Sequence, residues 1–187
     1  MDPLRSLVER LDTNDPATAA HGRAVALWCS RIAASMRLPR DEQNWIVRSA
    51  QLHDVGKLCI PADLLRAPRV LTSAERDLVR AHVIDGERLL ADYGLLVYRE
   101  AVRSHHERFD GRGYPDGLAG DAIPLPARIV AVADAYDAMT GQRPYRFPMT
   151  PDRALLEIER MRGTQFDPLV VDVMLSVVGD ALRPVAV

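Results

Sequence analysis

The stretch LHDVGK at residues 52–57 decides how we interpret the fold of this chain. It follows a segment whose apolar residues repeat every three or four positions, which predicts a helix beginning near Asp41. The same spacing places His53 and Asp54 at the inner end of that helix, with Gly56 as the residue that stops it. A histidine and an aspartate at the buried end of a helix indicate a polar centre inside a helical protein.

Further helices are predicted around that centre, and several of them carry a histidine or an aspartate on their apolar face. Their apolar repeats begin near Asp15, Thr72, Leu95 and Pro126 and place inward, in that order, His21, His82, the pair His105 and His106, and Asp134. Two more helices, from about Pro151 to Arg162 and from Asp167 to Gly179, contain no titratable cluster. Strand signals are almost absent, so we predict an all-α fold of about seven to nine helices.

The composition is that of an ordinary globular protein, with 187 residues of which 48% are hydrophobic and 27% charged. This length predicts a single compact domain covering 1–187. The formal net charge of -2 provides no basic footprint for long nucleic acid. Cys29 and Cys59 make no disulfide framework, and the start MDPLRSLVERLD lacks the apolar segment of a signal peptide. We therefore expect a cytoplasmic protein without a membrane span.

All five histidines of the chain belong to the inward-facing set, together with Asp54 and Asp134. A buried polar group without a partner costs about 1 to 3 kcal/mol, while a whole domain is stable by roughly 5 to 15 kcal/mol. Seven such groups therefore need compensation. Neutral imidazoles and carboxylates are ligands that divalent first-row metals accept, and one carboxylate can bridge two ions. We interpret the set as a metal site.

Lys57 is the only lysine of the chain and stands three residues after Asp54. A compact ammonium group differs most from a planar guanidinium beside a charged site, so we expect Lys57 to act there. Farther along, residues 110–126 contain four glycines and three prolines, which predicts a folded surface loop. Two interpretations of this loop stay open: it closes over the core, or it gates substrate or docks a partner.

Five motifs follow one another along the chain: HGRAV at 21–25, LHDVGK at 52–57, His82 with Gly86, HHERFDGRGYPDGL at 105–118 and RIVAVADAYDAMTGQRPYR at 128–146. In this order they resemble the HD-GYP domains, a branch of the HD metal-dependent phosphohydrolases. The resemblance covers nearly the whole chain. It implies an all-helical domain that hydrolyses the bacterial second messenger cyclic di-GMP to pGpG, GMP or both. We expect the metal-site core within 15–146, the Gly/Pro-rich GYP loop inside it, and supporting C-terminal helices within 150–180.

Individual metal ligands follow from the same resemblance. One ion would be held by His21, His53 and Asp134, and the other by His82, His105 and His106, with Asp54 as the bridge. Some members have a glutamate four residues before the first histidine that supports a third metal, but this chain has Ala17 there. We therefore expect two divalent ions, with iron or manganese favoured and other divalent metals compatible.

Contacts to the substrate are also implied by the resemblance. Lys57, Arg143 and Arg146 match positions that contact substrate phosphates, although a surface salt bridge is the alternative for the two arginines. Tyr114 belongs to the loop that shapes the pocket, and Asp54 and Lys57 would be catalytic. Asp137, one turn after Asp134, would orient a ligand histidine or else cap the helix or form a salt bridge. The GYP loop would also contact a diguanylate cyclase or another signalling protein.

Two alternatives to an active cyclic di-GMP phosphodiesterase stay open on the sequence. One is a catalytically weak or silent cyclic di-GMP receptor or protein-interaction module, which Ala17 and the short chain favour. The other is an HD phosphohydrolase that acts on a different nucleotide, because the ligand set fixes the phosphoester chemistry more tightly than the base.

Overall fold

The computed structural model describes residues 2–142 and 147–182, and within them the chain is helical, with no β-strand. Nine of the α-helices have six or more residues and α4 is a single turn, which confirms the predicted all-α fold. Two isolated β-bridges join loop residues, Asp110 to Ala119 and Arg162 to Phe166. The α-helices are α1 (Pro3–Asn14), α2 (Pro16–Ser35), α3 (Arg40–Leu52), α4 (Ala62–Leu65), α5 (Ser73–Arg80), α6 (His82–Asp92), α7 (Arg99–Ser104), α8 (Leu125–Thr140), α9 (Pro151–Arg160) and α10 (Pro168–Leu182); the 3-10 helices are η1 (Val55–Cys59), η2 (Leu96–Tyr98) and η3 (Gly120–Ala122).

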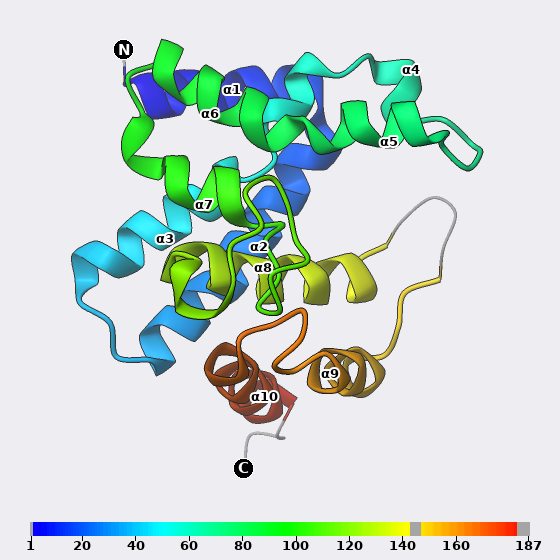
Figure 1. Ribbon diagram of the computed structural model, residues 1–187. Helices are drawn as coiled ribbons and strands as arrows, with labels where there is room; N and C mark the ends of the chain where they lie inside the picture. The colour runs from blue at the N-terminus through cyan, green and yellow to red at the C-terminus, as the bar shows by residue number, and fades with distance from the viewer. Residues whose placement is uncertain (1, 143–146, 183–187) are drawn as a thin grey trace.

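Helices α2 and α8 cross at the centre of the molecule, with α1 and α6 at one end and α9 and α10 at the other (Figure 1). Pro16 starts α2, and Asp15 caps it by accepting a hydrogen bond from the backbone N–H of Thr18 at 3.2 Å. Both central helices bury small or β-branched residues such as Val25, Ala26 and Ala133, which let their backbones approach closely. The centre of the fold is therefore where inward-pointing polar side chains of different helices can meet.

A helix that we did not predict from the sequence, α1, precedes this centre. Asp2 caps it through a hydrogen bond from the backbone N–H of Leu4 at 3.1 Å, and Pro3 occupies its first turn. Its buried residues Leu7 and Leu11 recur at helical spacing. Leu7 joins a second apolar cluster with residues of α3, η1, α6 and α7, so α1 covers the outer side of the metal-site helices.

Two predicted helix boundaries were wrong, and a histidine lies at each of them. We expected one apolar helical face from Thr72 to Leu89, but the chain breaks at Ala81 into α5 and α6. We also expected the helix from Asp41 to continue to Gly56, but α3 ends at Leu52. In both places a histidine Nδ1 binds the carbonyl three residues earlier, which a continuing helix would offer to the next backbone amide.

Gly56 has a different role from the helix stop that we predicted. A Cβ atom built on it would lie 1.9 Å from the backbone oxygen of His82 and 2.5 Å from the backbone nitrogen of Gly86. Only glycine therefore lets η1 pack directly against α6. This contact brings the residues that follow α3 next to the first turn of α6.

The C-terminal helices α9 and α10 support the central pair from the side away from α1 (Figure 1). Ala154, Ile158, Val170, Val171 and Met174 are buried and join the core cluster formed by α2 and α8. No helix in the described part of the chain is both long and apolar enough to cross a bilayer.

Candidate metal centre

All five imidazoles lie in one contiguous cluster. Ring centroids are 5.3 Å apart for His21 and His53, 5.0 Å for His53 and His105, and 4.1 Å for His105 and His106. His82 completes the cluster, at 5.4 Å from His105 and 5.1 Å from His106. These residues come from α2, the end of α3, the start of α6 and the end of α7, so the fold brings together side chains that are distant in sequence.

Asp54 lies at the junction of two ligand groups. Atoms of Asp54, His82, His105 and His106 are close enough to hold one ion, and atoms of His21, His53 and Asp54 are close enough to hold another. One carboxylate oxygen, Oδ1, lies 3.2 Å from His82 Nε2, while Oδ2 lies 3.3 Å from His53 Nε2. Each oxygen of this nearly inaccessible carboxylate therefore faces a different group, as a bridging ligand must.

Main-chain carbonyls orient three of the histidines. His53 Nδ1 lies 2.7 Å from the oxygen of Ala50, and His82 Nδ1 lies 2.7 Å from that of Val79. His105 Nδ1 follows the same rule, 2.9 Å from the oxygen of Val102. A carbonyl only accepts, so each Nδ1 carries the proton and each Nε2 presents its lone pair to the cluster. This is the arrangement in which imidazole binds a metal.

His21 is oriented by carboxylates instead. Its Nε2 lies 2.8 Å from Asp134 Oδ1, and its Nδ1 lies 2.7 Å from Asp137 Oδ2. Both aspartates are on α8, one turn apart, and Asp137 contacts His21, the histidine that we predicted as a ligand; the same contact is the salt bridge that we gave as the alternative. The side chains of His21 and Asp134 are 15% and 21% exposed, whereas that of His105 is inaccessible. We call His21, His53 and Asp134 the outer half of the site, and His82, His105 and His106 the inner half.

The two halves differ in electrostatics. Burial lowers the pKa of His21, but hydrogen bonds to Asp134 and Asp137 outweigh it and raise that pKa to about 9. Burial also opposes the raised pKa of His53, which the negative charge of Asp54 produces. In the inner half, burial and the neighbouring imidazoles lower the pKa of His105, and burial and His82 lower that of His106 to about 4.

Asp54 stays ionised despite its burial. Burial alone would raise its pKa, but the charges of His53 and Lys57 hold the pKa well below the ordinary value. Lys57 Nζ lies 2.5 Å from Asp54 Oδ2, and the lysine side chain is 26% exposed. Lys57 therefore stands between the buried carboxylate and solvent, where it can also meet an anionic ligand.

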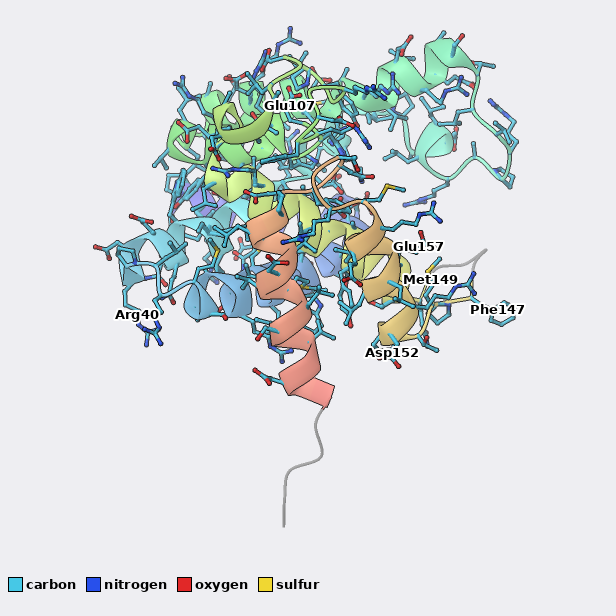
Figure 2. All side chains as sticks on the ribbon, turned by 60° about the horizontal axis from the view of Figure 1, so that its bottom comes forward. Arg40, Glu107, Phe147, Met149, Asp152 and Glu157 are labelled. Atoms are coloured by element: carbon cyan, nitrogen blue, oxygen red, sulfur yellow. The ribbon has the colours of Figure 1, made fainter. Side chains whose placement is uncertain are left out.

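The GYP loop is fastened to the inner half by Glu107, a residue that the sequence reasoning did not assign to the site. Glu107 is buried and follows His106 directly. Its Oε1 accepts from the backbone N–H groups of Asp116 at 2.7 Å and Gly117 at 3.1 Å, and its Oε2 accepts from that of Leu118 at 3.1 Å. Figure 2 labels Glu107 at this loop, well away from Asp152 and Glu157 on α9.

A second fastening of the loop is Arg103 on α7. Its guanidinium donates to both carboxylate oxygens of Asp116, at 2.7 and 2.8 Å, and to Glu87 Oε2 at 2.6 Å. Between these anchors, the ring of Tyr114 stacks on His106 with centroids 4.9 Å apart. The loop thus closes over the inner half and places Tyr114 against it, as expected for a residue that shapes the pocket.

Two predicted substrate contacts, Arg143 and Arg146, lie outside the described residues. The structure brings together all seven predicted metal ligands with Lys57 and Tyr114. The sequence reasoning missed Glu107, Arg103 and Asp116; for Glu107, its position next to the histidine pair was the available signal. Arg103 and Asp116 had no signal, because their pairing depends on how the loop folds back.

The chemistry of this cluster fits divalent metal ions. His53 Nε2 is buried and makes no hydrogen bond within the described residues, although it faces Asp54. His82 Nε2 and His105 Nε2 lie 3.4 Å apart, a distance at which two lone pairs need a shared cation or proton between them. Imidazole and carboxylate suit several first-row metals, so Asp54 with His82, His105 and His106 could hold one ion, and Asp54 with His21 and His53 could hold another. Asp134 belongs to neither of these groups and reaches the second through His21 Nε2.

Comparison with known proteins identifies the family of this chain. A sequence profile described as "HD domain" matches residues 5–170. The chain is 40% identical over 181 residues to the cyclic di-GMP phosphodiesterase response regulator RpfG of Xanthomonas campestris, covering 93% of this chain and 47% of that protein. It is 35% identical over 174 residues to 3'3'-cGAMP-specific phosphodiesterase 2 of Vibrio cholerae, covering 91% of this chain and 33% of the relative. The chain thus spans less than half the length of these two curated relatives.

The fold is shared with a solved structure at lower sequence identity. Bd1817, an HDG"Y"P protein from Bdellovibrio bacteriovorus, superposes with a TM-score of 0.71 at 18% identity, covering 91% of this chain and 55% of Bd1817. At that identity the likeness concerns the fold alone. With the profile match, the relatives and the motifs taken together, the chain belongs to the HD domain family, in its HD-GYP branch.

Proposed function

We propose that this domain is a metal-dependent phosphodiesterase that hydrolyses cyclic di-GMP to pGpG, GMP or both. The observation that carries the proposal is the sharing of Asp54 by two groups of ligand atoms. A site for one structural ion would need only one of these groups. A shared carboxylate between two groups is typical of binuclear hydrolases, which act on phosphate esters.

In this proposal, His21, His53 and Asp134 hold one ion, His82, His105 and His106 hold the other, and Asp54 bridges them. When bound, two divalent ions supply Lewis acidity that activates water and neutralises charge on a phosphodiester. Iron and manganese are the metals we favour, because imidazole with carboxylate suits both. Ala17 lies one turn before His21 on α2 and offers no ligand atom, which favours two ions over three.

Lys57 is the protein group that we propose acts directly on the substrate. Its ammonium group already balances the charge of Asp54 at 2.5 Å, and its partial exposure lets it reach outward. With cations on Asp54, the lysine is released to neutralise charge that builds on the phosphate oxygens in the transition state. Arg143 and Arg146 keep the same proposed role as phosphate contacts.

A second substrate has a specific observation in its favour. The Vibrio cholerae relative that is 35% identical to this chain is named as specific for 3'3'-cGAMP. That molecule differs from cyclic di-GMP in one base only, so the phosphoester chemistry of the centre would serve both. Cyclic di-GMP is the first candidate because the relative at 40% identity is named for it.

The surface of the GYP loop is proposed as the docking site for a protein partner. Arg112 and Gly117 on this loop are exposed, while its interior is fastened by Glu107. We propose a diguanylate cyclase or another signalling protein as that partner. Co-purification with and without Arg112→Glu would test it.

The test of the catalytic proposal is a turnover assay on protein purified without oxygen and loaded with iron or manganese. Cyclic di-GMP, 3'3'-cGAMP and a linear dinucleotide are supplied in parallel, and products are resolved by chromatography. We expect hydrolysis of cyclic di-GMP to pGpG or GMP, with metal content near two ions per chain. Removal of the metal by chelation should abolish turnover, and adding it back should restore it.

Three other results would contradict the proposal in different ways. Tight binding of cyclic di-GMP without product would make the protein a silent receptor. Hydrolysis of 3'3'-cGAMP or of the linear dinucleotide that is faster than hydrolysis of cyclic di-GMP would make that molecule the preferred substrate. Full activity after chelation would exclude the metal centre as the catalyst.

A further inference from the structure

Arg80 lies at the mouth of the metal centre, at the end of α5 and two residues before His82. Its guanidinium carbon is 5.2 Å from the centroid of the Tyr114 ring. The same ring stacks on His106, with centroids 4.9 Å apart and planes 27° from parallel. Arg80, Tyr114 and His106 therefore form a continuous path from an exposed cation to the ligands of the inner half.

Within residues 2–142 and 147–182, Arg80 is not held in a close ion pair, unlike Arg103 and Arg69. Arg103 and Arg69 both approach a carboxylate at 2.6 Å. The pair that Arg80 makes with Asp77 spans 3.8 Å, which is beyond hydrogen-bond length, and its side chain is 59% exposed. A guanidinium has five N–H donors and binds phosphate oxygens two at a time, so the donors of Arg80 are available to a ligand.

Contacts of the neighbouring loop residues with Glu107 fix the position of Tyr114 next to Arg80. Glu107 holds the backbone of residues 116–118 by three hydrogen bonds. Gly113 packs so closely that a Cβ atom on it would lie 2.4 Å from the Cα atom of Glu107. The loop therefore presents the Tyr114 ring in one place, and the ring face supports the guanidinium of Arg80.

We propose that Arg80 is a substrate-binding residue that contacts the second, non-reacting phosphate of a cyclic dinucleotide. This inference rests on the proposed function. A cyclic dinucleotide carries two phosphodiesters, and only one of them can lie at the metal centre beside Lys57. The other needs its own cation at the mouth of the site, and Arg80 meets this need.

The experiment measures binding and turnover separately in four proteins: the wild type, Arg80→Ala, Arg80→Lys and Arg88→Ala. Arg88 is the matched control, because it is an exposed arginine on α6 that pairs with Asp85 at 3.0 Å. Binding is measured by calorimetry on metal-loaded protein with a phosphorothioate analogue of cyclic di-GMP that resists hydrolysis. Turnover is measured with cyclic di-GMP, and metal content and unfolding temperature are determined for each protein.

For Arg80→Ala we expect the Kd for the analogue to rise about 10- to 100-fold, as loss of a hydrogen bond to a charged group predicts. KM for cyclic di-GMP should rise in parallel while kcat changes little, because this phosphate is not the reacting one. Arg80→Lys should recover part of the affinity by keeping the charge. Arg88→Ala should bind as the wild type does, and metal content should be the same in all four proteins.

Equal affinities of the wild type and Arg80→Ala for the analogue would overturn the inference, and so would a fall in kcat with no change in KM. The outcome is distinguishable from failure of the proposed function. A wild type that binds the analogue through Arg80 but releases no product would retain this inference and lose the catalytic proposal. If the wild type and Arg80→Ala hydrolyse cyclic di-GMP equally well, the catalytic proposal is retained and the inference about Arg80 is lost.

Discussion

The inner and outer halves of the metal centre both contain histidines, but the rings of His82 and His105 in one and of His21 in the other are oriented by different parts of the protein. In the inner half, His82 and His105 bind carbonyl oxygens of their own chain segments, three residues earlier. In the outer half, the side chains of Asp134 and Asp137 hold His21 from another helix. His82, His105 and, in the outer half, His53 are therefore fixed by local backbone, whereas His21 is fixed by tertiary contacts between α2 and α8. His82 and His105 follow from short-range structure, while the orientation of His21 depends on side chains that single substitutions can remove.

The largest effect is expected from the residue that belongs to both halves. Asp54→Ala removes the shared carboxylate and leaves the buried imidazoles without their counter-charge, at a cost of about 3 to 5 kcal/mol. Turnover should fall by about 100- to 10,000-fold, and metal content should fall in both halves. Elemental analysis and turnover of cyclic di-GMP check this, with exposed Asp41→Ala on α3 as the control. Asp54→Asn keeps the shape and should show the same loss; a variant that retains both ions would refute the bridging role.

The second prediction concerns the rate at which each half loses its ion, because the two halves differ in solvent exposure. A chelator should remove the outer ion first, because His21 and Asp134 are partly exposed while His105 is inaccessible. We expect the metal to be lost in two kinetic phases. Elemental analysis of samples taken at successive times measures this loss. His21→Ala should abolish the fast phase and leave the slow one. A single phase in the wild type would mean that the halves behave as one unit.

A smaller effect is expected from Asp137, which contacts the cluster through His21. Asp137→Asn replaces the charged acceptor that fixes the ring with a neutral amide, and such changes cost about 10- to 100-fold in metal affinity. The loss should be confined to the outer ion, as measured by competition with a metal-binding dye. No side-chain substitution can make the equivalent change at His82 or His105, because their orienting groups are backbone carbonyls. Loss of the inner ion in Asp137→Asn would contradict the separation of the halves.

A further prediction concerns the contribution of Glu107 to the stability of the loop that covers the inner half. Glu107→Gln keeps the volume but puts an amide donor where Oε1 or Oε2 accepts, so at least one backbone N–H group of the loop loses its acceptor. The free energy of unfolding should fall by about 1 to 3 kcal/mol, measured by denaturant titration. Exposed Glu42→Gln on α3 is the control. Unchanged stability of Glu107→Gln would mean that Arg103 and Asp116 hold the loop without Glu107.

The comparison of the halves also explains what the sequence could predict. Apolar spacing located most of the helices, and the intrusion of His82 and Asp134 into apolar faces indicated a metal site, while the division of its ligands between two ions came from the family resemblance. The helix ends at Leu52 and Ala81 were mispredicted, because apolar spacing continues through them while a histidine ring takes the carbonyl that the helix needs. The anchors Glu107, Arg103 and Asp116 were missed because their partners are set by the folded loop rather than by any local pattern.

The smallest effect is the pH dependence of the metal-free protein, in which the halves should respond in opposite directions. The pKa of His21 is raised from the ordinary 6.5 to about 9, so the folded form binds the extra proton and stability falls as pH rises through that range. The pKa of His106 is lowered to about 4, so the unfolded form binds the extra proton and stability falls as pH drops from 6.5 through 4. The unfolding temperature of the chelated protein should therefore be highest near pH 6.5. His21→Ala should flatten the dependence of unfolding temperature on pH above 6.5 and leave the dependence below 6.5 unchanged. NMR titration should give a pKa above 6.5 for the His21 ring and a pKa below 6.5 for the His106 ring. Both rings titrating together near 6.5 would show that the halves share one electrostatic environment.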